Sequence, residues 1–355
     1  MSEQTTQGTA GVPTSSEAPP PTGVPGDGTR KSGFQRFMSG SVGRNLGLVV
    51  ALIVLVIVGA VTAPDTFTSV SNILTILRQA SIIGVISIGM TLVIIAGGID
   101  LSVGSVMGLA SVVAALAAIQ DLADQLHWVV MVLIALAVGL AAGLVNGIVI
   151  AYGKVVAFMA TLAMLVAARG LAEILAERRT LQIGDRDFIE FMNLDIIGID
   201  MLIWIFAIVA ALGWVLLNRT TFGRRTVAIG GNREAARLAG INVKRHTMWL
   251  YAISGLCAGI AAVMILGRTT AGTSTHGQLY ELDAIAAVVV GGTLLVGGRG
   301  TITGTVFGVL IFATLTNVFV QNNLTSSVQA VAKGVIIVVA VLLQQRFAKP
   351  TGRAT

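Results

Sequence analysis

Few side chains in this 355-residue chain belong to the types that carry out covalent or metal chemistry. It holds a single cysteine, Cys257, which excludes a disulfide framework or a CxxC site. The three histidines lie far apart, without the spacing of a zinc site; they are His127, His246 and His276. The nearest approach to a phosphate-binding loop, 147–154, is one residue too long and is followed by Val155 where Ser or Thr is needed. We therefore expect no metal, no cofactor and no enzymatic activity from this chain.

One acidic residue, Asp100, separates two uncharged runs, 79–99 and 101–120, each long enough to cross a membrane. A charge at mid-membrane depth costs about 2.5–3.5 kcal/mol on insertion scales, so this carboxylate should face protein, water or the interface. Glycines around it favour irregular backbone. Two interpretations stay open: a gate or hinge, or an acid that caps the following helix. The gate motif comprises Gly97, Gly98, Asp100, Ser102 and Gly104.

The composition of the whole chain predicts its fold class. Hydrophobic residues make up 55% of the chain and charged residues 11%, with a mean hydropathy of +0.87. A soluble domain carries about 25% charged residues. We therefore predict an all-α polytopic membrane protein. The net charge of +6 lies in loops between apolar runs, which favours a role in membrane orientation over nucleic-acid binding.

Runs without Asp, Glu, Lys or Arg predict about ten membrane helices within residues 46–345, the transmembrane domain. The predicted spans are 45–64, 79–99, 101–120, 128–153, 155–175, 201–218, 246–267, 284–298, 300–321 and 328–345. Of the 23 Lys and Arg residues, 16 fall on the side of the termini and five in the opposite loops. The positive-inside rule therefore predicts that both termini are cytoplasmic. The flanking segments are a disordered cytoplasmic tail (1–29), a basic membrane-surface segment (30–45) and a second cytoplasmic tail (346–355).

Glycine spacing adds two expectations. Gly139, Gly143 and Gly147, like Gly255 and Gly259, recur every four residues, which places them on one helix face for close packing. The stretch 97–108 also echoes 297–308, which suggests an internal repeat. Whether its halves run parallel or inverted stays open.

The loop 218–246 has a short helical pattern from Glu234 to Leu238, with Gly240 suited to a C-terminal cap. Its small-residue face, which includes Ala235 and Ala236, could dock on a soluble partner. An ordinary basic loop that obeys the positive-inside rule is the other interpretation.

Two motifs resemble a known family. Glu234, Ala235, Ala236 and Gly240 match the Glu-Ala-Ala-x-x-x-Gly pattern in the coupling loop of ATP-binding-cassette (ABC) importer permeases. The stretch 96–104, Ala-Gly-Gly-Ile-Asp-Leu-Ser-Val-Gly, resembles the signature of ribose/xylose/galactose-type sugar permeases, as do 290–293 and 297–300. The likeness covers roughly residues 45–347. Unlike many importer permeases, the loop lacks a downstream Ile-x-Leu-Pro, which fits the sugar subgroup.

The resemblance implies a bacterial plasma-membrane permease for a small sugar or polyol that acts by alternating access. Implied partners are a cytoplasmic ABC ATPase that docks on 218–246 (with Arg237), an extracytoplasmic sugar-binding protein, a second permease copy and the lipid bilayer. The amides of Asn146, Asn317 and Gln329 could line the path, although such groups more often join helices. Arg169 and Glu173 are expected to pair.

An ion-coupled secondary transporter is the alternative function. It would require coupling groups at mid-membrane, where Asp100 is the single acidic candidate and lies near a span end. An intramembrane enzyme ranks last, because no two catalytic-type residues share helical spacing within a span.

Overall fold

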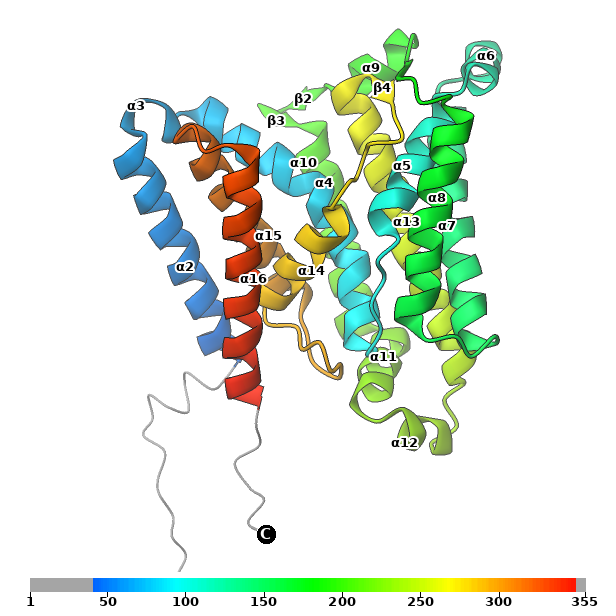
Figure 1. Ribbon diagram of the computed structural model, residues 1–355, viewed down its shortest axis with the longest axis vertical. Coiled ribbons are helices and arrows are strands. Elements are labelled where there is room, and N and C mark those ends of the chain that lie inside the picture. Colours follow the sequence, from blue (N-terminus) through cyan, green and yellow to red (C-terminus); the bar gives the residue numbers. More distant parts are fainter. Residues whose placement is uncertain (1–40, 349–355) are drawn as a thin grey trace, which may run out of the picture.

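The computed structural model describes residues 41–348 (Figure 1). The predictions for 1–29, for most of 30–45 and for 349–355 lie outside the described residues. The predicted all-α polytopic fold is confirmed. The helices are α2 (Ser41–Thr62), α3 (Pro64–Phe67), α4 (Val70–Ile95), α5 (Val103–Ala114), α6 (Ala117–Gln125), α7 (Val129–Ala151), α8 (Ala157–Leu175), α9 (Arg186–Met192), α10 (Met201–Arg219), α11 (Thr221–Gly231), α12 (Arg233–Leu238), α13 (Val243–Thr269), α14 (Tyr280–Val290), α15 (Ile302–Gln321) and α16 (Ser326–Ala348).

Within the described residues, six helices are long and apolar enough to cross a membrane: α4, α7, α8, α10, α13 and α15. A seventh crossing results if α5 and α6, which meet at 57°, form one broken span. Each predicted span overlaps a helix of the structure. Helices α5 and α14, however, have 12 and 11 residues, fewer than the roughly 20 that a crossing needs. The count of ten therefore stays a prediction.

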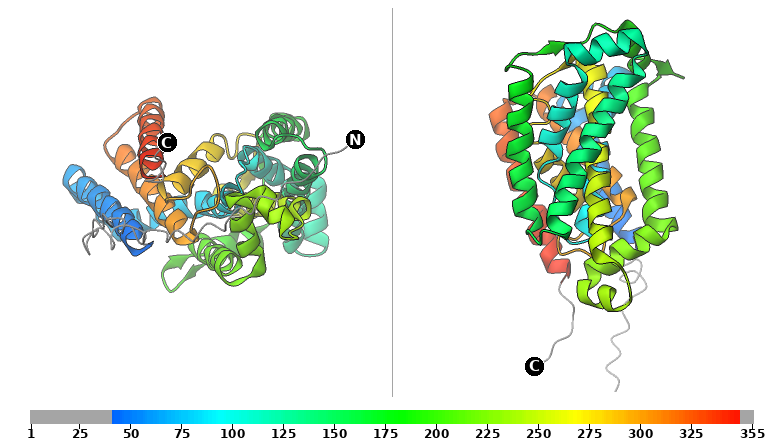
Figure 2. Two further views of the ribbon diagram at one scale, coloured as in Figure 1. Left: turned by 90° about the horizontal axis from the view of Figure 1, so that it is seen from below. Right: turned by 90° about the vertical axis from the view of Figure 1, so that its right-hand side faces the viewer.

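The helices form a bundle whose cross-section is elongated. Helices α2, α15 and α16 lie at one side of it, and α7 and α8 lie at the other (Figures 1 and 2). Helices α4 and α13 are buried along most of their length and form its centre. Helix α2 begins and α16 ends at the end of the bundle that carries α11 and α12 (Figure 1). We call this end the α12 end and the other the α9 end.

Close packing of α7 on α13 follows the predicted glycine stripes. A Cβ atom on Gly143 would overlap the backbone oxygen of Tyr251, and one on Gly255 would lie 2.8 Å from the Gly143 backbone. Only glycine allows the two backbones to approach so closely. The packing role predicted for these glycines is confirmed.

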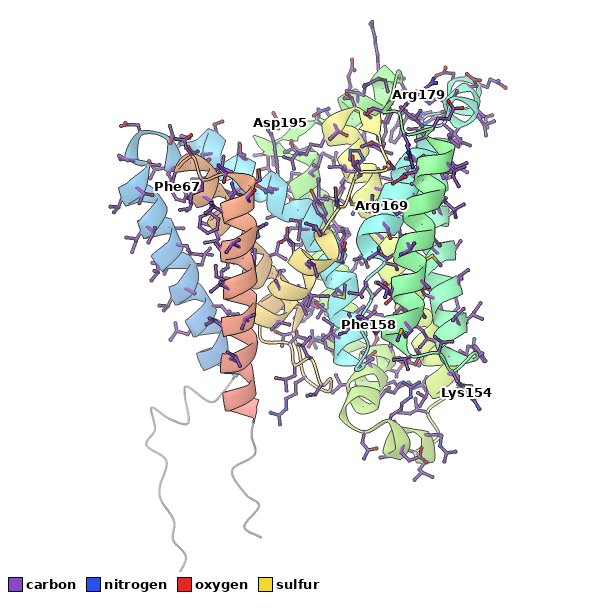
Figure 3. All side chains as sticks on the ribbon, in the orientation of Figure 1. Phe67, Lys154, Phe158, Arg169, Arg179 and Asp195 are labelled. Atoms are coloured by element: carbon purple, nitrogen blue, oxygen red, sulfur yellow. The ribbon has the colours of Figure 1, made fainter. Side chains whose placement is uncertain are left out.

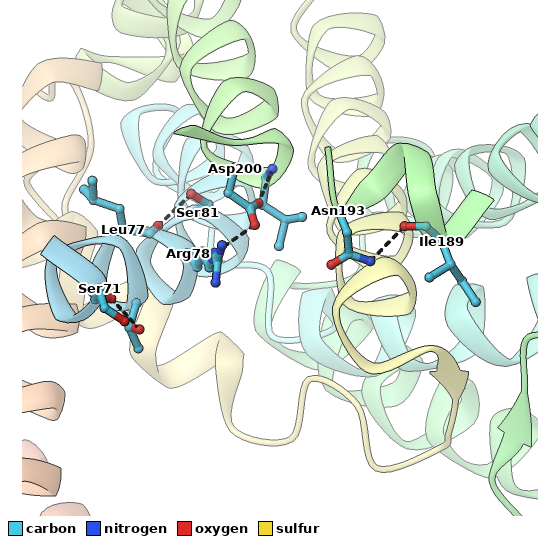
Figure 4. A network of polar contacts seen from close by, with 9 residues as sticks. Ser71, Leu77, Arg78, Ser81, Ile189, Asn193 and Asp200 are labelled. Carbon is cyan, nitrogen blue, oxygen red and sulfur yellow. Dashed lines mark hydrogen bonds and ion pairs between the residues drawn. The ribbon is translucent and has the colours of Figure 1, made fainter. Parts of the chain in front are cut away.

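Two pairs of short strands lie at the α9 end, together with an ion pair between α4 and the start of α10. Strand β1 (Leu181–Gln182) pairs with β4 (Ala271–Gly272), and β2 (Asp195–Ile196) pairs with β3 (Ile199–Asp200). Arg78 of α4 lies 2.7 Å from Asp200, whose other carboxylate oxygen caps α10 through the Leu202 N–H (Figure 4). The pair fixes the start of α10 against α4.

Candidate coupling and gating site

Helix α12 is stabilised at both ends by local sequence. The side chain of Asn232 accepts a hydrogen bond from the Ala235 N–H, which is a standard N-cap. At the other end Gly240 has φ +82°, its N–H bonds to the Arg237 carbonyl, and the Ile241 N–H bonds to the Ala236 carbonyl. These two bonds form a Schellman motif, which requires the left-handed residue. The predicted helix and its glycine cap are confirmed.

The exposed surface of α12 differs from the predicted small-residue face. Ala236 is buried against Ile229 and Val243, so it anchors the helix and is not available to a partner. Ala235 and Leu238 are exposed, and the Leu238 side chain is 76% accessible. Leu238 is therefore the large apolar side chain that α12 presents to the solvent.

Glu234 and Arg237 form an exposed ion pair one turn apart on α12. The Arg237 Nε donates to both carboxylate oxygens of Glu234 at 3.1 Å. Hydrogen bonds from the guanidinium hold the pKa of the Glu234 carboxyl below its ordinary value. Because both side chains are about two-thirds exposed, the pair adds little to folding, and both charged groups remain accessible to a partner.

The gate motif forms the turn between α4 and α5, and Asp100 ties it to two other helices. Its Oδ1 accepts hydrogen bonds from the Ser102 N–H and hydroxyl, at 3.0 and 2.6 Å. Its Oδ2 accepts one from the Ser254 hydroxyl of α13 at 2.8 Å. The Asn146 amide of α7 donates to the Ser102 oxygen at 2.9 Å. Asp100 is fully buried, so these donors replace its lost hydration.

The helix-capping interpretation of Asp100 needs correction. The N-cap residue of α5 is Ser102, and Asp100 lies two residues earlier and bonds to that residue's N–H. Gly97 has φ +81°, which provides the reversal out of α4. Gly104 packs on the backbone of Gly277, in the segment before α14. The motif is therefore a turn fixed by three neighbouring elements.

Three glycine-rich segments converge at the α12 end. The Gly298 N–H donates to the Ile95 carbonyl at the end of α4, at 2.8 Å. A Cβ on Gly230, at the end of α11, would overlap that same carbonyl oxygen and lie 2.5 Å from the Gly298 nitrogen. A Cβ on Gly297 would lie 2.9 Å from the Gly97 nitrogen. The turn α4–α5, the loop α14–α15 and the end of α11 therefore touch through backbone atoms, and we call this contact the glycine junction.

The junction also bears on the internal repeat. Gly97 and Gly297, the matching positions at an offset of 200, lie side by side at one end of the bundle. This arrangement fits the parallel alignment, and the repeat itself stays a prediction.

The three predicted path amides are each bonded within the protein. Asn146 bonds to Ser102, as described above. Asn317 of α15 and Asn72 of α4 exchange two hydrogen bonds, at 2.8 and 3.1 Å. The Gln329 amide donates to the Leu324 carbonyl at 2.8 Å. The structure thus gives Asn146 and Asn317 a helix-joining role, whereas Gln329 bonds to the turn that precedes its own helix, α16. The three amides do not contact one another.

The α9 half contains an irregular segment that the sequence did not reveal. Arg169 of α8, labelled in Figure 3, donates hydrogen bonds to the carbonyls of Ser274 and His276. It does not form the predicted ion pair with Glu173. The Glu173 carboxylate lies 3.4 Å from Arg178 instead. The Arg169 bonds fix the non-helical residues 273–279 against α8. Such backbone within a membrane protein is tolerated where it is buried or lines a cavity.

Sequence reasoning missed Ser254, Tyr251 and Gly230. Ser254 and Asp100 are 154 residues apart, and nothing local marks their contact. The Tyr251 hydroxyl bonds to the Ile99 carbonyl at 3.3 Å. The adjacent glycines Gly230 and Gly231 could have indicated a close backbone contact, because two glycines at a helix end are costly without a packing reason.

Among the described residues no cluster of three His, Cys, Asp or Glu side chains could hold a metal ion.

Comparison with known proteins places the chain among transport proteins. The family described as "Branched-chain amino acid transport system / permease component" matches residues 72–342. The ribose import permease protein of Haemophilus influenzae is 40% identical over 82% of this chain and 90% of its own length. The Bacillus subtilis ribose import permease protein is 39% identical over 85% and 93%. The L-arabinose transport system permease protein of Escherichia coli is 36% identical over 90% and 95%. No solved structure matches.

Proposed function

This chain belongs to the family of transport-system permease components, and on that premise we propose that it is the membrane-spanning subunit of an ABC importer for a small sugar or polyol. The matched family is described by amino-acid transport, whereas the compared relatives are named for ribose and L-arabinose and align over more than four fifths of this chain. The relatives support a sugar as the solute, because each aligns over at least 82% of this chain and 90% of its own length. They also favour this function over ion-coupled transport.

The observation that carries the proposal is the glycine junction beneath α12. Helix α12 presents an exposed surface with two charged side chains, and it follows the end of α11 after one residue, Asn232. Gly230 at that end of α11 lies in backbone contact with the turns that follow α4 and α14. A partner that moves α12 would move these turns with it. The chain therefore supplies two states of similar free energy, and the partner's nucleotide cycle biases them.

The proposed assembly follows from this role. A cytoplasmic ATPase docks on α12 and hydrolyses ATP, so the permease itself carries out no chemistry. A second copy of the chain completes the translocation path, and an extracytoplasmic sugar-binding protein delivers the solute at the α9 end, which carries the acidic loops. The complex lies in the bacterial plasma membrane, with both termini of the chain in the cytoplasm.

Uptake by cells that express or lack this chain tests the proposal. We expect labelled ribose, arabinose or xylose to accumulate only when the chain is present, and uptake to persist after a protonophore collapses the proton gradient while ATP is maintained. Uptake abolished by the protonophore at constant ATP would favour the ion-coupled alternative.

A further inference from the structure

A cavity of about 600 Å³ opens at the α12 end, between α12, the turn from α7 to α8 and the start of α13. Gly97 and Gly98 of the gate motif form part of its wall. Its charged lining consists of four cations and one carboxylate, namely Lys154, Arg233, Arg237, Lys244 and Glu234. The cavity therefore has an excess of three positive charges, from four cations less one anion.

Three of these cations have no acidic partner among the described residues. Glu234 is paired with Arg237, and no carboxylate lies within ion-pair distance of Lys154, Arg233 or Lys244. The Lys244 Nζ lies 6.0 Å from the ring centre of Tyr152, a cation–π contact that leaves its charge uncompensated. Positive charges gathered in one concave site repel each other unless an anion joins them.

The start of α8 adds hydrogen-bond donors to the same wall. Val155, Val156 and Ala157 line the cavity, and the N-cap residue Val156 has no side-chain acceptor for the first-turn N–H groups. The positive end of a 19-residue helix therefore faces the same space as the lysines. Backbone donors together with Lys and Arg are the groups that bind phosphate oxygens.

Exposed apolar side chains adjoin the charged cavity. Val156, Phe158 and Met159 are 69%, 48% and 60% accessible, and they lie in the segment that begins α8 (Figure 3 labels Phe158). In a membrane protein this surface meets the acyl chains at the level where headgroups begin. A phosphate can therefore reach the cavity either from the bilayer or from the solution.

We propose that this cavity binds a phosphate group, carried either by an anionic phospholipid or by a soluble phosphate ester. Lys154, Lys244 and Arg233 neutralise the phosphate, and the first turn of α8 donates hydrogen bonds to it. Because the cavity touches both α12 and the gate motif, a bound phosphate links the docking helix to the gate. This site is independent of which solute the protein imports.

The test compares two charge-removing variants of the purified full-length chain in nanodiscs. Lys154→Gln/Lys244→Gln removes two cavity cations, and Arg224→Gln/Arg225→Gln removes two exposed cations of α11 outside the cavity. One arm adds phosphatidylglycerol to phosphatidylcholine nanodiscs and counts retained lipids by native mass spectrometry. The other titrates inorganic phosphate and a pentose phosphate into phosphatidylcholine nanodiscs by calorimetry. Each cavity cation is worth roughly 1 kcal/mol of binding free energy. We therefore expect the cavity variant, which lacks two of them, to bind the phosphate probe about 30-fold more weakly than the wild type.

Each outcome bears on the proposal. Loss of phosphatidylglycerol in the cavity variant alone supports a lipid headgroup, and loss of soluble phosphate binding in that variant alone supports a phosphate ester. Lys154→Arg/Lys244→Arg keeps the charge and should retain binding, which separates charge loss from misfolding. Equal weakening in both Gln variants, or no binding of either probe by the wild type, would overturn the proposal.

Discussion

At the scale of single residues, Asp100 is a buried carboxylate held by three hydrogen-bond donors, and none of the described cations forms an ion pair with it. Two donors come from Ser102 and one from Ser254 on a helix far away in sequence. Hydrogen bonds to a charged acceptor are stronger than neutral ones, so this residue can tie the gate turn to α13. We infer that its role is positional, since its oxygens are all engaged inside the protein.

Asp100→Asn is expected to lower stability by about 1–3 kcal/mol and to reduce transport. The amide nitrogen cannot accept a hydrogen bond, so one serine donor is left facing another donor. Thermal unfolding in detergent and sugar uptake measure the two effects. Asp65→Asn, at an exposed acid of the α9 end, is the control and should behave as wild type. Normal uptake by Asp100→Asn would rule out a role for this network in gating.

Lys333 and Asp283 form a second polar contact inside the bundle, between α16 and α14. Their side chains are about one fifth exposed and lie 3.2 Å apart. Lys333→Met should destabilise the protein by about 3 kcal/mol, because Asp283 is left without a partner at low dielectric. The double variant Lys333→Met/Asp283→Leu should recover most of this loss in the unfolding temperature. A double variant as unstable as Lys333→Met would show that the unpaired Asp283 carboxylate is not the cause of the loss.

At the scale of elements, Gly230 and Gly231 provide a matched test of the glycine junction. A Cβ on Gly230 would overlap the Ile95 carbonyl, whereas one on Gly231 would meet nothing within 4 Å. Gly230→Ala should therefore separate α11 from α4 and reduce both stability and ATP-driven uptake. Gly231→Ala should leave uptake unchanged and stabilise α11 by up to about 1 kcal/mol. Equal uptake by the two variants would contradict the junction's role.

The elements differ in how far sequence alone predicts them. Helix α12 was predicted because its signals are local: a short helical run and a glycine suited to a left-handed C-terminal cap. The short length of α5 was not, because a run without charges shows where apolar residues lie but not where the backbone breaks. The Asp100–Ser254 bond and the glycine junction depend on tertiary contacts between distant segments. They lie outside what residue spacing can indicate.

At the scale of the whole molecule, orientation can be tested with the single native cysteine removed. Cys257 is buried, so Cys257→Ala gives a background without reactive thiols. In that background Leu238→Cys lies on α12, and Ile197→Cys lies at the α9 end, where the native side chain is 90% exposed. A membrane-impermeant thiol reagent should label Ile197→Cys on spheroplasts and Leu238→Cys only after lysis. The reverse pattern would invert the proposed topology.

Copurification tests most directly whether the protein binds an ABC ATPase through α12. The tagged protein is released gently from its native membranes, and associated proteins are identified for wild type, Glu234→Arg, Leu238→Asp and the control Leu126→Asp, an exposed leucine at the α9 end. We predict that an ABC ATPase accompanies the wild type and the control and is lost from both α12 variants. An ATPase that persists with both α12 variants would contradict docking on this helix. Absence of any ATPase, together with transport by the purified chain down an ion gradient, would contradict the importer itself.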